Sequence, residues 1–532
     1  MNPRTQGSWH RPSILLIFSF FLTTALLLWQ GHVGLSLWDE GFLLYGVQRV
    51  LLGEVPIRDF QAYDPGRYYL VAAIMRVIGD HSILSFRTAT ALFQTLGLFT
   101  GLLLITQAKR SQNHKSSLTF LCLSAVTLMV WMYVRHRAID YAMPIFLVGV
   151  LAFLVSKPIP VRYFIAGVGV GLVAVFGRNH GIYGAAGTLG VMIFLAIRHA
   201  PKSAVLRGAL LWGAGVIAGF LPVILMTILI PGFASAFRDD LLFLFERKST
   251  NLPLPVPWPW ALEFSAMPWN RAIDSFLTSF YFMAVLAFGV IAVIWIVYRV
   301  WKGKSVSSVL VASASLALPY AHYSFSRADT EHLSLGVFPL LLSCLAALSV
   351  AKARVKWGLV TILCLTSVWL ILPSYPGWQC AVSGKCVHIE VFRTPIQVIP
   401  EVAFDISRIR DLARRYAPGD QPFIAAPFWP GAYALLERRS PMWSIYAILP
   451  RSESFQKKEI ERIKAASPGF AYILNWPLDH RKELTFKNTH PLVYQYITDH
   501  FERLPRLPHS PYYAFEEAFR SKEARISSPL KR

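Results

Sequence analysis

Two adjacent carboxylates follow the first long apolar stretch of the chain. Residues 13–31 carry no charge, and the sequence Trp38-Asp39-Glu40-Gly41 comes shortly after them. A carboxylate beside a weak nucleophile such as a hydroxyl can act as a general base, and one positioned base accelerates a reaction by about 10²–10⁴-fold. Asp39, with Glu40 beside it, is therefore a candidate base. The alternative is that Asp39 only caps a helix that begins there.

Cationic and imidazole side chains gather at three later points where an apolar stretch meets water. A guanidinium group suits a phosphate, because its planar fork donates paired hydrogen bonds. Ionisable groups near hydrocarbon are costly, which favours a function for them. The predicted substrate-binding residues are Arg135, Arg137, Arg178, His180, His322, Arg327, Asp329 and His332. The alternatives are arginines that snorkel to the membrane interface and an ordinary polar loop.

A divalent metal is a further possibility for one of these groups. His322, Glu331 and His332 have suitable ligand atoms, but their spacing is not that of a known metal site. We therefore expect neither a metal nor another cofactor.

The composition indicates that a membrane positions these residues. Of 532 residues, 54% are hydrophobic and 15% charged, whereas soluble domains are about a quarter charged. This excludes a disordered chain and an ordinary soluble enzyme. A hydrocarbon core needs roughly 20 apolar residues per helix. The predicted spans are 13–31, 84–106, 118–134, 141–156, 163–177, 182–197, 209–230, 276–298, 309–325, 333–351 and 357–373. The predicted fold class is an α-helical polytopic membrane protein with about 11 transmembrane helices.

The distribution of charge predicts the orientation. The net charge of +22, from 52 Lys and Arg against 30 Asp and Glu, would suggest nucleic acid in a soluble protein. With the N-terminus in the cytoplasm, the short cytoplasmic loops contain Lys and Arg but no Asp or Glu. The positive-inside rule therefore explains the basic balance, and no nucleic-acid partner is expected. Residues 374–532 then lie outside the cytoplasm.

The tail changes character, which predicts two domains: a membrane domain over 1–373 and an extracytoplasmic α/β domain over 374–532. Helical patterns cover 402–416, 431–439, 453–466 and 490–503, and strand patterns cover Phe423–Ala426, Trp443–Ile448, Phe470–Leu474 and Tyr512–Phe515. Alternation of this kind favours a largely parallel sheet. Cys380 and Cys386 form either a disulfide or two free thiols.

Two loops outside the cytoplasm have further patterns. The first loop has two amphipathic stretches, Phe42–Leu52 and Tyr68–Ile78, that look like helices lying at the membrane interface. The loop 231–275 is rich in Pro and Trp, and its Asp239 and Asp240 are expected on a solvated helix face.

Three motifs in residues 38–90 resemble the GT-C glycosyltransferases. They are Trp38-Asp39-Glu40-Gly41 with Tyr45, Gly53 with Pro56 and Asp59, and Tyr63-Asp64-Pro65. The closest branch is that of the protein mannosyltransferases, the lipid A aminoarabinose transferases and the Rgt-like proteins. The resemblance implies many spans, two interfacial helices in the first outer loop and a soluble C-terminal domain.

The resemblance also implies a reaction. The donor is a polyprenyl-phosphate sugar, and an acid of the first outer loop is the catalytic base, which places that role on Asp39. A second acid at the start of the fourth span corresponds to Asp140. A sugar phosphate already has a good leaving group, so a single base suffices and the anomeric centre is inverted. Arg178 and Arg327 would hold the phosphate, and Asp329 and His332 the sugar hydroxyls.

The resemblance places the protein in a bacterial inner membrane, among membrane lipids, with its C-terminal domain in the periplasm. The acceptor would be a hydroxyl of a lipid-linked or other cell-envelope molecule. A flippase or transporter of lipid-linked saccharide is an alternative, although transporters have polar groups near the middle of the bilayer. A ligase that joins a preassembled glycan to its acceptor is a second alternative.

Overall fold

The computed structural model describes residues 12–110, 117–198, 202–247, 251–506 and 514–522. The chain divides into two compact units. The first comprises Met1–Trp29 and Arg87–Gln379, and the second comprises Gln30–Phe86 and Cys380–Arg532.

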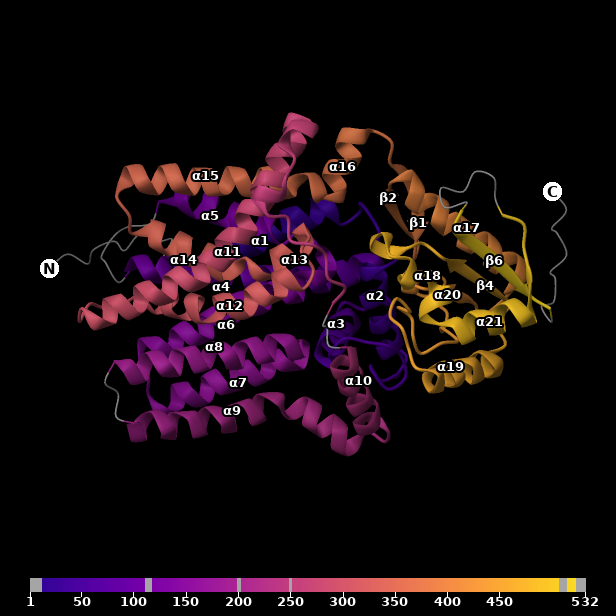
Figure 1. The fold of residues 1–532 in the computed structure, drawn as a ribbon, viewed down its shortest axis with the longest axis horizontal. Helices are drawn as coiled ribbons and strands as arrows, with labels where there is room; N and C mark the ends of the chain where they lie inside the picture. The colour runs from indigo at the N-terminus through magenta and orange to yellow at the C-terminus, as the bar shows by residue number, and fades with distance from the viewer. Residues whose placement is uncertain (1–11, 111–116, 199–201, 248–250, 507–513, 523–532) are drawn as a thin grey trace. The chain divides into compact units, whose positions relative to one another are not determined.

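The first unit is a bundle of helices (Figure 1). They are α1 (Pro12–Gln30), α4 (Ile83–Arg110), α5 (Leu118–Val130), α6 (Ala138–Ser156), α7 (Pro160–Phe176), α8 (Arg178–Ile197), α9 (Lys202–Leu229), α10 (Phe233–Arg247), α11 (Trp269–Trp301), α12 (Ser308–Ser326), α13 (Thr330–Gly336), α14 (Phe338–Ser349) and α15 (Ala353–Ile371). Short 3₁₀ turns include η2 (Arg135–Arg137), which precedes α6. Each predicted span corresponds to a helix or, for 333–351, to the pair α13 and α14.

The long apolar helices make this a multi-pass membrane protein. Within the described residues, seven helices are long and apolar enough to cross a membrane, or eight if the pair α13 and α14 is one span. The pair bends by 56°, because Pro339 has no N–H to continue the helix across Val337. Helices α5 and α7 are apolar but shorter. The count of eleven spans stays a prediction.

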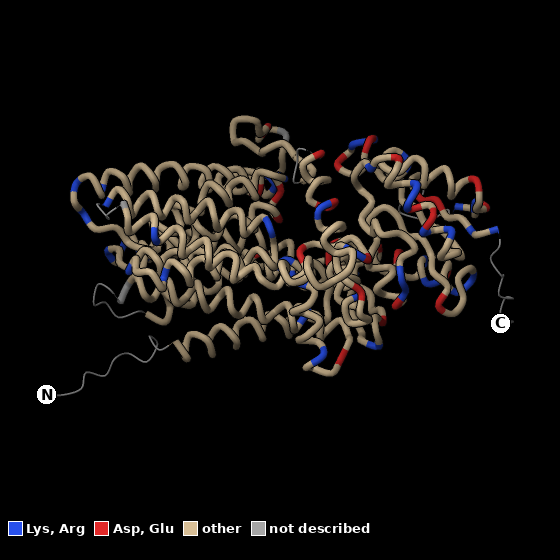
Figure 2. The backbone as a smooth tube through the Cα atoms, turned by 90° about the horizontal axis from the view of Figure 1, so that it is seen from below, with Lys and Arg blue, Asp and Glu red and all other residues tan. Residues whose placement is uncertain are grey.

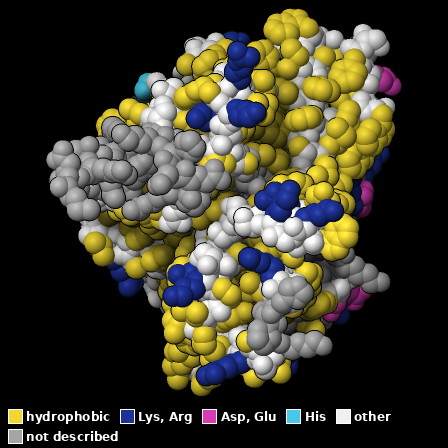
Figure 3. Space-filling model, turned by 90° about the vertical axis from the view of Figure 1, so that its left-hand side faces the viewer, with side chains coloured by type: hydrophobic (Ala, Val, Ile, Leu, Met, Phe, Trp, Pro, Cys, Tyr) yellow, Lys and Arg dark blue, Asp and Glu magenta, His cyan; other side chains and the backbone are white. Residues whose placement is uncertain are grey.

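Charge is distributed unevenly along the bundle. Figure 2 shows the helices almost free of Lys, Arg, Asp and Glu along their length, with Lys and Arg at the end where α8 connects to α9 and α14 to α15. Figure 3 looks onto this end, where blue Lys and Arg side chains lie among hydrophobic ones and magenta carboxylates appear only at the rim. These connections are loops predicted to be cytoplasmic, and their charge is what the positive-inside rule expects.

The second unit contains a small sheet with helices around it. Its helices are α2 (Asp39–Leu51), α3 (Pro65–Ile78), α17 (Pro400–Tyr416), α18 (Pro430–Leu435), α19 (Glu453–Ala466), α20 (Phe486–Thr489) and α21 (Pro491–His500), and α16 (Pro376–Ser383) leads into it. Strands β1 (Val387–Val391) and β2 (Thr394–Val398) form a hairpin. Strands β3 (Ile424–Ala426), β4 (Phe470–Leu474), β5 (Phe501–Arg503) and β6 (Glu516–Ser521) form a sheet in the order β3-β4-β6-β5.

The sheet corrects part of the prediction for the tail. Only β3 and β4 are parallel, whereas β4–β6 and β6–β5 are antiparallel, so the expectation of a largely parallel sheet is wrong. The predicted strand Trp443–Ile448 is irregular instead. Residues 512–513 of the fourth predicted strand lie outside the described residues, and β6 begins at Glu516, just after its end.

The second unit also includes the first outer loop. The Gly34 amide donates to the Gln397 carbonyl at 2.7 Å, and the Gln397 amide donates to the His32 carbonyl at 2.8 Å. The Gly431 amide donates to the Leu37 carbonyl at 2.8 Å. The predicted boundary at residue 373 came from hydropathy, whereas packing joins residues 30–86 to the tail. Cys380 and Cys386 form a disulfide, which decides between the two alternatives.

Candidate active site

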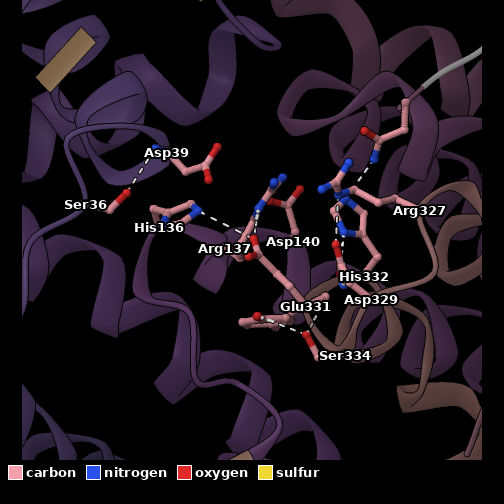
Figure 4. A network of polar contacts seen from close by, with 12 residues as sticks. Ser36, Asp39, His136, Arg137, Asp140, Arg327, Asp329, Glu331, His332 and Ser334 are labelled. Carbon is pink, nitrogen blue, oxygen red and sulfur yellow. Dashed lines mark hydrogen bonds and ion pairs between the residues drawn. The ribbon is translucent and has the colours of Figure 1, made fainter. Parts of the chain in front are cut away.

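Asp39 and Glu40 form the first turn of α2 in the second unit. The N-cap is Trp38, which makes no side-chain capping bond, so the Asp39 carboxylate is not the cap. The Ser36 hydroxyl accepts from the Asp39 amide at 3.3 Å (Figure 4), and Glu40 Oε2 accepts from the Ser36 amide at 3.4 Å. The dipole at the start of α2 favours negative charge at both positions.

The two carboxylates differ in exposure. Glu40 is buried at 2% exposure, whereas Asp39 is only partly buried. The Tyr446 hydroxyl donates to Asp39 Oδ1 at 3.3 Å. Asp39 is therefore the carboxylate that a substrate could reach, and Glu40 is better suited to holding the start of α2.

In the first unit, His136 and Arg137 of η2 point toward Glu331 at the start of α13 (Figure 4). Arg137 Nε lies 3.1 Å from Glu331 Oε1, and His136 Nε2 lies 3.8 Å from the same oxygen. The Ser334 hydroxyl donates to the Tyr141 hydroxyl at 3.1 Å. This network ties α6 to α13. Arg135 is partly buried at the start of the same 3₁₀ turn.

Asp140 and His180 form a buried pair between α6 and α8. His180 Nε2 lies 3.0 Å from Asp140 Oδ1, and His180 Nδ1 lies 2.8 Å from the Tyr320 hydroxyl. His180 is 0% and Asp140 1% exposed. Both side chains are thus enclosed in this arrangement, and their geometry suits holding α6, α8 and α12 together rather than direct contact with substrate. His322 is more exposed and bonds through Nδ1 to the Tyr183 hydroxyl at 2.9 Å.

Arg327, Asp329 and His332 form a second charged network. Arg327 Nε donates to Asp329 Oδ2 at 2.9 Å, and His332 Nδ1 lies 2.8 Å from Asp329 Oδ1. Burial by itself raises the pKa of Asp329, but the hydrogen bonds from His332 and the nearby Arg327 charge hold that pKa below its usual value. Asp329 therefore fixes the positions of both neighbours.

His332 is also bound on its other side. Its Nε2 lies 2.7 Å from Asn251 Nδ2, in the loop rich in Pro and Trp. With Nδ1 on Asp329, both ring nitrogens are engaged, which leaves neither to coordinate a metal in this arrangement.

Arg178 differs most from its predicted surroundings. Its Nη2 lies 2.8 Å from Asp240 Oδ2 on α10, and its guanidinium lies 5.1 Å from the centre of the Phe237 ring. The Asp240 side chain is only 16% exposed, so its expected place on a solvated face is wrong. An arginine in the first turn of α8 opposes the helix dipole, and Asp240 compensates it.

Sequence reasoning missed three partners of these residues. They are Tyr446, Tyr320 and Asn251, which contact Asp39, His180 and His332. Tyr320 lies close in sequence to His322, so the density of polar groups in this segment could have indicated Tyr320 as a partner. No local signal connects Tyr446 with Asp39.

Comparison with known proteins identifies the fold. No protein-family model matches the sequence, and no curated protein matches it. Solved structures do match over nearly the whole chain, and they are GT-C glycosyltransferases. The chain therefore has the GT-C fold, as residues 38–90 predicted.

The individual matches are distant in sequence. ArnT from Cupriavidus metallidurans bound to undecaprenyl phosphate has a TM-score of 0.56 at 12% identity, over 98% of this chain and 99% of that one. The apo form of ArnT from the same organism has a TM-score of 0.53 at 13% identity, over 94% of this chain and 97% of that one. The apo oligosaccharyltransferase from Archaeoglobus fulgidus has a TM-score of 0.50 at 12% identity, over 99% of this chain and 76% of that one.

Proposed function

We propose that the protein is an integral-membrane glycosyltransferase that transfers a sugar from a polyprenyl-phosphate donor to a hydroxyl of a cell-envelope acceptor. The observation that carries the proposal is the match, over 98% of this chain and 99% of that one, to the fold of ArnT bound to undecaprenyl phosphate. The motif residues of the first outer loop support it, since Asp39 opens α2 and is partly exposed. The orientation proposed above puts the reaction on the periplasmic face of a bacterial inner membrane.

In the proposed reaction, Asp39 takes the proton of the acceptor hydroxyl. The hydroxyl oxygen forms a bond to the anomeric carbon, and the bond from that carbon to the phosphate oxygen breaks. The phosphate leaves with the electron pair, and the configuration inverts. One base suffices because the leaving group is already an anion of low basicity.

The phosphate needs a fixed cation, and Arg178 and Arg327 are the two predicted candidates. Each has a carboxylate that orients its guanidinium, Asp240 at 2.8 Å from Arg178 and Asp329 at 2.9 Å from Arg327. At either arginine the donor phosphate would have to compete with that carboxylate. We propose Arg135 and Arg137 as further cations at this end of α6, while Asp140 and His180 hold the helices that carry them.

A ligase that transfers a preassembled glycan is the second candidate. The match to an oligosaccharyltransferase over 99% of this chain favours it. Both candidates break the same kind of bond, and they differ in whether the donor carries one sugar or many.

The test is transfer by the purified full chain in lipid nanodiscs. Labelled polyprenyl-phosphate monosaccharides and a lipid-linked oligosaccharide are offered with an envelope extract, using wild type, Asp39→Asn and the control Asp80→Asn. Asp80 is exposed and bonded to Ser82, outside the proposed machinery. We expect transfer by wild type and Asp80→Asn and a loss of at least about 10²-fold in Asp39→Asn. Full activity of Asp39→Asn refutes the base, and movement of intact donor between leaflets without cleavage supports a transporter.

A further inference from the structure

We infer that Tyr446, in the C-terminal tail, is a positioning residue for Asp39. The inference rests on the proposed function, in which Asp39 is the base. Its structural basis is the hydrogen bond from the Tyr446 hydroxyl to Asp39 Oδ1, at 3.3 Å, between residues 407 positions apart in the sequence.

The backbone that carries Tyr446 is fixed by the first outer loop. The Trp443 indole N–H donates to the Ile57 carbonyl at 2.9 Å, and the Gln61 amide donates to the Trp443 carbonyl at 2.9 Å. The Tyr446 amide donates to Gln61 Oε1 at 2.9 Å, and the same oxygen accepts from the Ser444 hydroxyl at 3.4 Å. The segment 443–446 is thus held by the loop that contains Asp39.

The Tyr446 ring is fixed as well. It packs edge-on against Phe42, with ring centres 5.7 Å apart, and Phe42 packs against Tyr63 at 4.7 Å. The guanidinium of Arg67 lies 4.9 Å from the centre of the Tyr63 ring. Phe42 lies in the first turn of α2 with Asp39, so the same helix end fixes both the donor and the acceptor of the hydrogen bond.

This geometry suits the chemistry of a base. A phenol donates a hydrogen bond to the carboxylate without adding a positive charge, whereas an arginine at this position would stabilise the anion more strongly and weaken it as a base. With Oδ1 held by Tyr446, the carboxylate has a defined orientation, and Oδ2 is the oxygen that takes the proton. A separation of 3.3 Å is long for an O–H···O bond, so we expect an effect on rate of about 3- to 10-fold.

The test compares Tyr446→Phe with Tyr494→Phe in the full chain. Tyr494 on α21 makes the same kind of contact in the same unit, since its hydroxyl donates to Glu517 Oε2 at 2.9 Å. We expect Tyr446→Phe to lower kcat by about 3- to 10-fold with an unchanged KM for the donor, and Tyr494→Phe to leave kcat unchanged. Unchanged kcat in Tyr446→Phe, or an equal loss in Tyr494→Phe, would overturn the inference.

A second measurement separates this inference from the proposed function. Melting temperatures are compared for Asp39→Ala, Tyr446→Phe and the double variant, which needs no transfer assay. Non-additive shifts are expected, because each single change removes the same hydrogen bond. Additive shifts in melting temperature would overturn the positioning role of Tyr446, whether or not the variants transfer sugar. Non-additive shifts combined with full transfer activity in Asp39→Asn would establish the contact but refute Asp39 as the base.

Discussion

The close approach of Gly41 and Gly431 gives the sharpest prediction about the position of Asp39. Gly41 lies on α2 two residues after Asp39, and an added Cβ would lie 2.4 Å from the Cα and 2.5 Å from the amide nitrogen of Gly431. A Cβ added at Gly431 would lie 2.8 Å from the Leu37 Cα and carbonyl oxygen. Two backbones therefore touch where α2 begins, and neither can move aside as a flexible side chain would.

The size of the effect follows from these distances. Ordinary contacts of a Cβ begin at 3.4 Å, so Gly41→Ala must separate α2 from α18 by about 1 Å. Overpacking of this kind costs about 1–3 kcal/mol, but alanine in a helix gains up to about 1 kcal/mol over glycine. The net loss of stability is therefore small. A displacement of about 1 Å at a catalytic group, by contrast, can lower the rate about 10²-fold.

The assay is sugar transfer and melting temperature for Gly41→Ala, with Gly358→Ala as the matched control. Gly358 is also helical, on α15, and a Cβ there meets nothing within 4 Å. We expect a loss of about 10²-fold in kcat for Gly41→Ala with a drop of a few degrees in melting temperature, and no loss for Gly358→Ala. Wild-type kcat in Gly41→Ala would refute the claim that α18 fixes the end of α2 that carries the proposed base.

Two further predictions concern charge. Burial, together with the nearby charges of Glu516 and Glu401, raises the pKa of Asp405 to about 8, so the folded state binds a proton that the unfolded state releases near pH 4. The free energy of unfolding should therefore fall by at most about 5 kcal/mol as pH rises from about 4 to about 8. The Asp405→Asn variant should have a higher melting temperature than wild type at pH 9 but not at pH 4. An equal difference in melting temperature at the two pH values would contradict this. For the ion pair between Arg178 and Asp240, Arg178→Gln and Asp240→Asn should each lower the melting temperature, and the double variant should lose less than their sum. If Arg178 instead held the donor phosphate, only its replacement would raise the KM for the donor.

Much of the bundle could be predicted because its signal is local. A helix in hydrocarbon must satisfy its own backbone hydrogen bonds, so an apolar stretch such as 276–298 already specifies a helix, here α11. The sequence signal for the helices of the tail is equally local, and α17 and α19 begin within two residues of their predicted starts. The bend at Val337 and the start of α8 at Arg178 were not predicted, because both depend on a few residues where the apolar pattern is interrupted.

The partners of the charged residues could not be predicted, because they are set by packing between distant segments. Asp240 lies in a sequence rich in charge, which is typical of a solvated face, yet its contact with Arg178 shields it. The prediction of a largely parallel sheet is wrong for a related reason. Strand and helix alternation favours parallel pairing, but the connection from α21 through β5 to β6 reverses the chain, and β6 pairs antiparallel to both of its neighbours.

The segment Trp443–Ile448 explains why the tail contributes to the candidate site. Its β-branched and aromatic residues are typical of a strand, and a strand would place them in a ladder of backbone bonds. The Trp443 indole and the Tyr446 amide bond instead to Ile57 and Gln61, in the first outer loop. The irregular segment thus supplies both a support for the loop that carries Asp39 and the Tyr446 hydroxyl. A regular strand at 443–448 would have used the Tyr446 amide within the sheet rather than on Gln61, so the absence of a strand and the proposed positioning of Asp39 are linked through the same hydrogen bond.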